Sequence, residues 1–350
     1  MLVTAAAFTA WWVLSIYRPP AAMSVETQNG GKDLQAYRLI VERVHQGENY
    51  YTAAGQELRD GGYATSSVFN WRLPTYAWLL AAFPQPEWGQ ALLALLALAA
   101  LALAYAAERN EGGVGRAVLL MVLMLGAFLW CIDGDAFFSQ ELWAGVLITV
   151  SVGAFAMNQR AAGLTPAGFV GIAAGLAALF LRELAAPYIL VAMVLACRER
   201  RWREVAAWCA GVAAFAIFFV WHAKQVQLHL TGSELAETEG WIQWGGPAFV
   251  IHACQMNVWL FNLPDWVALL FLFASLLGFA GRQGHTVLRA KATVIIYVLT
   301  FLIVGKSCNN YWGLLFVPLL PLGLVRLAEA CKSFGLARID LPRSVVVVRE

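Results

Sequence analysis

A carboxylate stands near the start of a polar stretch that separates two apolar parts of the chain. Asp33 follows Gly30-Gly31-Lys32, and apolar residues recur after it at helical spacing, at positions 34, 37, 41 and 44. We therefore expect an amphipathic helix that lies along a membrane interface, with Asp33 in its first turn. An aspartate in that position is typical of a capping residue, because it accepts from backbone N–H groups and complements the helix dipole.

Two more acidic residues flank a glycine, in Asp133-Gly134-Asp135. Carboxylates at this spacing could share a divalent cation, so Asp133 and Asp135 are weak candidates for a metal site. An Asp-Gly pair is also typical of a solvated turn, and we favour the turn. The sequence predicts no certain cofactor, with a divalent cation as the one candidate.

A pair of opposite charges, Arg182-Glu183, interrupts a long apolar stretch. Charges at the turn of a hairpin too short to leave the bilayer are costly unless they are used. The two residues could pair with one another, or Arg182 could bind an anion such as a lipid phosphate. Lys306 directly follows another apolar run, where a lysine is usually an interfacial anchor. With Arg72, these cations could also form a site for an anionic headgroup.

Aromatic and amide side chains occur in two polar stretches of the chain. Tyr37 and Trp71 lie in the first, and Gln243 and Trp244 lie in the second. Such side chains suit the faces and hydroxyls of sugars, but Tyr and Trp are also typical of the membrane–water interface. Composition and position leave both interpretations open.

The chain that must position these residues is far more apolar than a soluble protein. It has 350 residues, of which 60% are hydrophobic and 13% charged, with a net charge of +2 and a mean hydropathy of +0.64. A soluble domain carries about 25% charged residues. These values exclude a disordered chain and give no basic field for nucleic acid.

The apolar residues come in blocks of the length that crosses a bilayer, since a hydrocarbon core of about 30 Å takes about 20 helical residues. Polar and apolar residues do not alternate within them, which leaves helices as the spanning element. We predict ten transmembrane helices: Leu2–Ile16, Trp88–Ala107, Ala117–Ile132, Leu142–Met157, Ala167–Leu181, Leu184–Ala196, Val205–Trp221, Trp266–Ala280, Ala292–Val304 and Tyr311–Leu327.

The topology depends on whether residues 167–196 form one long helix or a hairpin that turns at Arg182-Glu183. A hairpin places most of the 24 basic residues in cytoplasmic segments, as the positive-inside rule requires. We therefore predict a single transmembrane domain over residues 1–330, followed by a short cytoplasmic tail over residues 331–350. Two long loops, at residues 17–87 and 222–265, then face the outside and are the expected place for chemistry.

This layout resembles the GT-C superfamily of membrane glycosyltransferases, which use polyprenyl-phosphate-linked sugars. The residues that carry the resemblance run through most of the chain: Asp33-Leu-Gln-Ala-Tyr37, Gly47-Glu-Asn-Tyr50-Tyr51, Pro74, Arg182-Glu183, Arg198-Glu-Arg-Arg-Trp-Arg203, Lys306 and Asn310-Tyr311-Trp312. The sequence departs from the family in two ways. Only Cys331–Glu350 follows the last predicted span, so we expect no counterpart of the large soluble C-terminal domain of many members, and Lys32 stands where some members have a second acidic residue.

The resemblance implies an all-α, polytopic membrane enzyme of the bacterial plasma membrane, with its site facing the periplasm or the cell exterior. It would move a sugar from a polyprenyl-phosphate donor to a hydroxyl of a glycan, glycolipid or protein, with inversion. Asp33 would be the general base, and no general acid is required because a lipid phosphate leaves readily. Arg182, Lys306 and, less surely, Arg72 would bind the lipid phosphate, and Tyr37, Trp71, Gln243 and Trp244 the sugar or acceptor.

Two other classes of function compete with this interpretation. A transporter or flippase of a lipid-linked sugar would usually show repeated halves and charges at the membrane midplane. The sequence shows no internal repeat, and its polar residues gather at one face of the membrane instead. A non-catalytic subunit of a membrane complex is the other alternative.

Overall fold

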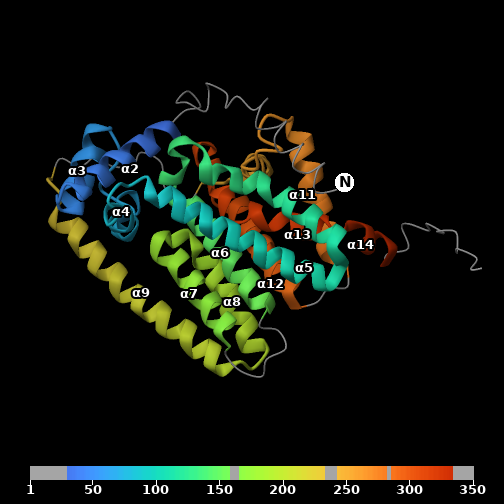
Figure 1. Ribbon diagram of the computed structural model, residues 1–350. Helices are drawn as coiled ribbons and strands as arrows, with labels where there is room; N and C mark the ends of the chain where they lie inside the picture. Colours follow the sequence, from blue (N-terminus) through green and yellow to red (C-terminus); the bar gives the residue numbers. More distant parts are fainter. Residues whose placement is uncertain (1–29, 158–164, 233–242, 282–284, 334–350) are drawn as a thin grey trace, which may run out of the picture.

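A computed structural model describes residues 30–157, 165–232, 243–281 and 285–333. The predicted span Leu2–Ile16 and most of the predicted tail lie outside these ranges. Within them the chain is helical throughout, with α-helices joined by turns and short 3-10 segments. Figure 1 shows a helical bundle in which the three N-terminal helices gather at one end, while α9 (Trp202–Leu228) runs along one side.

The described part of residues 17–87, predicted as an outer loop, contains three α-helices, α2 (Gly30–His45), α3 (Tyr50–Asp60) and α4 (Pro74–Ala81). The helix expected around Asp33 is confirmed as α2, and it ends before Gly47, whose φ of 92° suits glycine. The sequence analysis did not foresee α3. Its signal is Asn49, whose side chain accepts from the backbone N–H of Tyr51 over 2.9 Å and so caps the helix.

Apolar helices build the rest of the bundle, and the chain is an all-α polytopic membrane protein. Within the described ranges, three segments are long and apolar enough to cross a membrane, judged by length and composition: Trp88–Ile132, Gln140–Met157 and Trp202–Leu228. The helices from α5 onward are α5 (Trp88–Phe128), α6 (Gln140–Met157), α7 (Pro166–Leu181), α8 (Ala186–Arg198), α9 (Trp202–Leu228), α10 (Gly246–Cys254), α11 (Asp265–Ala280), α12 (His285–Ile303), α13 (Leu320–Leu324) and α14 (Leu327–Ser333).

Helix α5 contains the predicted span Trp88–Ala107 and most of the span Ala117–Ile132, whose end forms the 3-10 segment η2 (Leu129–Ile132). The two spans fold back on one another at Gly113. Gly113 has a φ of 79°, in the left-handed region that favours glycine. At the far end of the two arms, the Gln90 side-chain amide donates to the carbonyl of Gly134 over 3.4 Å. Beside the turn, Glu108 pairs with both Arg116 and Arg326 and so fixes it to the C-terminal helices.

The predicted hairpin at Arg182-Glu183 is also found, because α7 ends at Leu181 and α8 begins at Ala186. Arg182 is extended, with a φ of −150°, and a short 3-10 turn, η4 (Glu183–Ala185), leads into α8. The second long loop is partly helical. Helix α9 continues to Leu228, and α10 lies within the stretch that was predicted as a loop.

The prediction of one continuous helix over Tyr311–Leu327 is wrong. This part of the chain consists of η5 (Ser307–Leu315), η6 (Val317–Leu319) and two short helices, α13 and α14. Pro318 and Pro321 lack the N–H group that a continuous helix needs at these positions. The apolar run Tyr311–Leu327 is long enough to span a membrane as one helix, but it forms a broken segment that packs against α6 and α10.

Close backbone packing holds this broken segment against α6. A Cβ atom added at Gly145 of α6 would lie 2.0 Å from the backbone oxygen of Leu314. We expect Gly145→Ala to destabilise the protein by about 1–3 kcal/mol, because the backbone of η5 must move. Gly115→Ala is the matched control, since nothing lies within 4 Å of its added Cβ. Thermal unfolding in detergent should show a lower melting temperature for Gly145→Ala alone, and equal values would contradict the packing argument.

Candidate functional site

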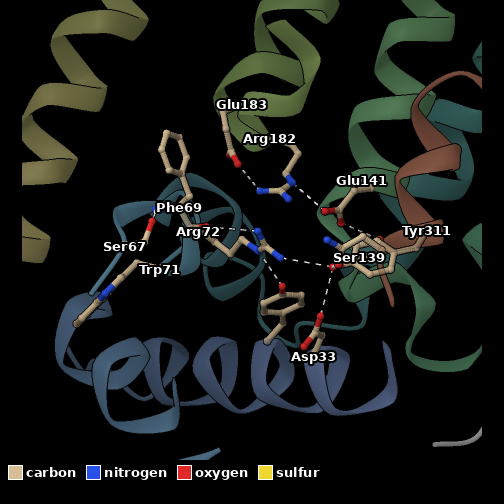
Figure 2. A network of polar contacts seen from close by, with 12 residues as sticks. Asp33, Ser67, Phe69, Trp71, Arg72, Ser139, Glu141, Arg182, Glu183 and Tyr311 are labelled. Carbon is tan, nitrogen blue, oxygen red and sulfur yellow. Dashed lines mark hydrogen bonds and ion pairs between the residues drawn. The ribbon is translucent and has the colours of Figure 1, made fainter. Parts of the chain in front are cut away.

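Charged and phenolic side chains from several elements meet where α2 lies against the membrane helices (Figure 2). Asp33 stands in the first turn of α2, and the Tyr311 hydroxyl of η5 donates to its Oδ2 atom over 3.3 Å. Burial raises the pKa of Asp33, although the Arg72 guanidinium and the hydroxyls of Tyr63 and Tyr311 lower it. The net shift is upward, so Asp33 is a dehydrated carboxylate with a raised proton affinity.

The guanidinium of Arg72 lies between two tyrosines. Its Nε donates to the Tyr37 hydroxyl over 2.8 Å, and one terminal nitrogen donates to the Tyr311 hydroxyl over 3.5 Å. The same guanidinium lies 5.7 Å from the centre of the Tyr37 ring. Within the described residues, its hydrogen bonds run to the two phenols and to the Phe69 carbonyl, and it forms no ion pair with a carboxylate. Its positive charge is therefore not neutralised by a bonded acid.

The backbone at Arg72 is strained. Its φ of 57° lies in the left-handed region, which costs a residue with a side chain on the order of 1–3 kcal/mol. The Tyr50 hydroxyl stabilises this turn, because it donates to the carbonyl of Trp71 and, over 3.2 Å, to the carbonyl of Arg72. Trp71 is buried, and its indole N–H donates to the Thr65 carbonyl over 2.9 Å. The turn thus aims the Arg72 side chain at the site.

Arg182 is paired with two acids. Its Nε donates to Glu141 at the start of α6 over 2.8 Å, and a terminal nitrogen bonds Glu183. The side chains of Arg182 and Glu141 are each 1% exposed, and the Ser139 hydroxyl donates to the second oxygen of Glu141 over 3.2 Å. The mutual ion pair that the sequence allowed is therefore present, together with a second carboxylate that the sequence analysis did not assign to it.

Three other predicted site residues, Lys306, Gln243 and Trp244, lie on segments next to the one that carries Tyr311 or precede it in the chain. Lys306 directly precedes η5, the segment that carries Tyr311. The backbone carbonyl of Gln243 accepts from the N–H of Gly305 over 3.0 Å, which places Gln243 beside the same segment. Trp244 is 74% exposed. Of the predicted residues, hydrogen bonds join Arg72 to Tyr37 directly and to Asp33 through the Tyr311 hydroxyl, and Figure 2 shows Arg182 facing the same space.

The two weak metal candidates, Asp133 and Asp135, have different surroundings. Asp135 forms an ion pair with Arg38 of α2, with a nitrogen–oxygen distance of 3.3 Å. Asp133 directly precedes the 3-10 segment η3 (Gly134–Phe138) and has an extended backbone. Among the residues that the structure describes, no group of three or more His, Cys, Asp or Glu side chains is arranged to hold a metal ion.

Three residues of the site were missed by the sequence analysis: Tyr311, Tyr63 and Glu141. Tyr311 was predicted to begin a membrane helix, and its contact with Asp33 joins residues at opposite ends of the chain. Glu141 had a usable signal, because an acid in the first turn of a buried apolar helix needs a cation nearby. The sequence did not identify Arg182 as that cation.

No protein-family model and no curated protein sequence matches the chain. Its structure is similar to the crystal structure of ArnT from Cupriavidus metallidurans in the apo state, with a TM-score of 0.51 over 94% of this chain. ArnT belongs to the GT-C glycosyltransferases. The chain has the GT-C fold. It spans 62% of the length of the ArnT chain and is 15% identical to it, so the likeness establishes the fold and not the activity.

Proposed function

We propose that this GT-C protein is a glycosyltransferase that moves a sugar from a polyprenyl-phosphate donor to an acceptor hydroxyl. The observation that supports this most directly is the half-buried Asp33 with a raised pKa, which shares the Tyr311 hydroxyl with Arg72, a guanidinium that forms no ion pair with a carboxylate of the described residues. A base and a cation at one membrane rim are what this transfer needs. ArnT, with the same fold, uses polyprenyl-phosphate-linked sugar, which favours the same donor class here.

Asp33 acts as the general base in this proposal. The acceptor hydroxyl loses its proton to the Asp33 carboxylate while its oxygen attacks the anomeric carbon of the sugar. The bond between that carbon and the phosphate oxygen breaks, and the bonding electrons leave with the polyprenyl phosphate. One displacement of this kind inverts the anomeric configuration. The acceptor is a glycan, a glycolipid or a protein on the periplasmic or outer face of a bacterial plasma membrane.

Arg72 is the strongest candidate for the departing phosphate. Its charge is held by phenolic hydroxyls rather than by a carboxylate, so a phosphate would meet an available guanidinium. Arg182 is already bonded to Glu141 and Glu183 and would act on the phosphate from a distance. Because these acids and Asp33 outnumber the two arginines, an anionic donor requires another cation, and Lys306 beside η5 is proposed to supply it. Tyr37 would contact the sugar or the acceptor, and Gln243 and Trp244 would do so from the neighbouring segment.

The base assignment predicts that Asp33→Asn abolishes transfer while the protein still inserts and folds. The amide keeps the size of the side chain but cannot accept the proton. Transfer of labelled sugar from polyprenyl-phosphate donors to membrane acceptors should fall by at least about a hundredfold, the lower end of a general base contribution. Asp60→Asn, at the exposed end of α3, is the control and should keep its activity. Transfer that survives in Asp33→Asn would remove the base assignment.

The raised pKa predicts the pH dependence of the reaction. Asp33 must be deprotonated to act, so kcat/KM should rise with pH through a value above the ordinary aspartate pKa of about 3.9. Tyr63→Phe removes a hydroxyl that lowers the pKa of Asp33, and the acidic limb should therefore move to higher pH. Tyr105→Phe on α5 should leave the limb in place. A limb that stays fixed in Tyr63→Phe would show that another group controls it.

The two arginines should differ in their effect on the donor. Arg72→Gln should weaken donor binding by about tenfold or more, because one charge-assisted hydrogen bond is worth about 1.5–3 kcal/mol. Arg182→Ala leaves Glu141 buried without its cation, so it should lower the melting temperature as well as weaken the donor. Donor KM and thermal unfolding, measured together, separate the two effects. An unchanged donor KM in Arg72→Gln would contradict its role, and an unchanged KM in Arg182→Ala would leave it a structural ion pair.

A further inference from the structure

A small hollow lies beside Arg72, on the side of the Arg72 turn that faces α2, α3 and α4. Its empty space is about 280 Å³ when the open mouth is counted, but the part that a water-sized group can occupy is about 10 Å³, enough for about one such group. Its wall includes Tyr37 of α2, Tyr50 of α3, Tyr76 of α4, and Gln140 at the start of α6. Tyr37 and Arg72 belong both to the hollow and to the charged site, so the two are continuous.

Gln140 is the unexplained group in this hollow. Its side chain is 3% exposed, and its Oε1 atom has no hydrogen-bond partner among the residues that the structure describes. A buried polar atom without a partner costs free energy, and such atoms are rare in folded proteins. Because Oε1 is an acceptor, the group that would satisfy it must carry an O–H or N–H donor.

The other walls of the hollow restrict what that group can be. Two of the phenolic hydroxyls already donate, Tyr50 to backbone carbonyls and Tyr76 to the Phe137 carbonyl over 3.4 Å. The Tyr37 hydroxyl accepts from Arg72 and forms no hydrogen bond with Oε1 of Gln140. Arg72 disfavours an ammonium group by like charge. An alkyl chain would leave Gln140 unsatisfied. The hollow therefore suits one neutral hydroxyl group, and the aromatic side chains around it suit the face of the ring that carries this hydroxyl.

We propose that this hollow receives a hydroxyl-bearing edge of the transferred sugar, and that a sugar hydroxyl donates to Oε1 of Gln140. The inference rests on the proposed function, because Arg72 would hold the phosphate to which that sugar is attached. Gln140 is then a residue that selects the sugar by its hydroxyl pattern. It contributes little to the binding of the phosphate or of the polyprenyl chain.

The test compares two kinds of soluble probe on the full chain in detergent. Farnesyl phosphate carries only the chain and the phosphate, whereas farnesyl-phosphoryl glucose, mannose, galactose and arabinose each add one sugar. In Gln140→Leu, the affinity for the sugar-bearing probe that binds the wild type most tightly should fall roughly two- to tenfold, as expected for one lost hydrogen bond. The affinity for farnesyl phosphate should stay within about twofold. Gln90→Leu, an amide at the same end of the bundle outside the hollow, is the matched control and should change neither affinity.

Thermal unfolding of the free protein separates a binding role from a structural one. Gln140→Leu removes an unsatisfied buried acceptor, so its melting temperature should equal or exceed that of the wild type. A lower melting temperature, or an equal loss of affinity for both kinds of probe, would make Gln140 a structural residue and overturn the inference. If farnesyl phosphate binds but no sugar improves on it, the inference fails and the proposed function stands. If farnesyl phosphate itself does not bind, the proposed function fails and the inference falls with it.

Discussion

The site depends on the burial of one guanidinium at the rim of the helical bundle. Arg182 is almost completely shielded from solvent, and a charge in that setting is tolerated only with a hydrogen-bonded partner. Its two acids come from different elements, Glu141 from α6 and Glu183 from the turn before α8. The pair of bonds therefore joins the start of α6 to the break between α7 and α8. That break is where the chain must reverse to return through the membrane.

The two arginines of the site, Arg72 and Arg182, differ in whether their charge is neutralised by a bonded carboxylate. Arg182 is neutralised by carboxylates, whereas Arg72 is held by phenolic hydroxyls, which fix its direction and leave its charge available. The left-handed backbone at Arg72 is energetically unfavourable, and the hydrogen bond from the Tyr50 hydroxyl helps to hold it in this conformation. Strain of this kind persists only where neighbouring contacts enforce it. The fold thus accepts a loss of stability that places one cation near one buried carboxylate, Asp33.

The sequence predicted helices whose position depends on local hydropathy, but it did not predict contacts between residues that are far apart in the chain. Apolar length located α6, α7 and α11 within one or two residues, and the distribution of basic residues correctly required the hairpin at Arg182. Hydropathy alone missed the breaks at Pro318 and Pro321, although the prolines were a readable signal. Asp33 and Arg72 stood out by residue type. The contact of Asp33 with Tyr311 could not be predicted, because no local pattern encodes a meeting of segments from opposite ends of the chain.

Asp33 lies in the first turn of α2, where a helix-capping role and the proposed role as a general base looked like alternatives. A carboxylate near a helix N-terminus is stabilised in its charged form, which lowers its pKa. The Arg72 guanidinium and the two phenols act in the same direction, and yet the net shift of the pKa is upward. Desolvation therefore outweighs all of these favourable contacts. A carboxylate that is well positioned by the helix and poorly hydrated in its pocket is held in place and is also a stronger base, so a helix-terminal position and a base role are compatible in the same residue.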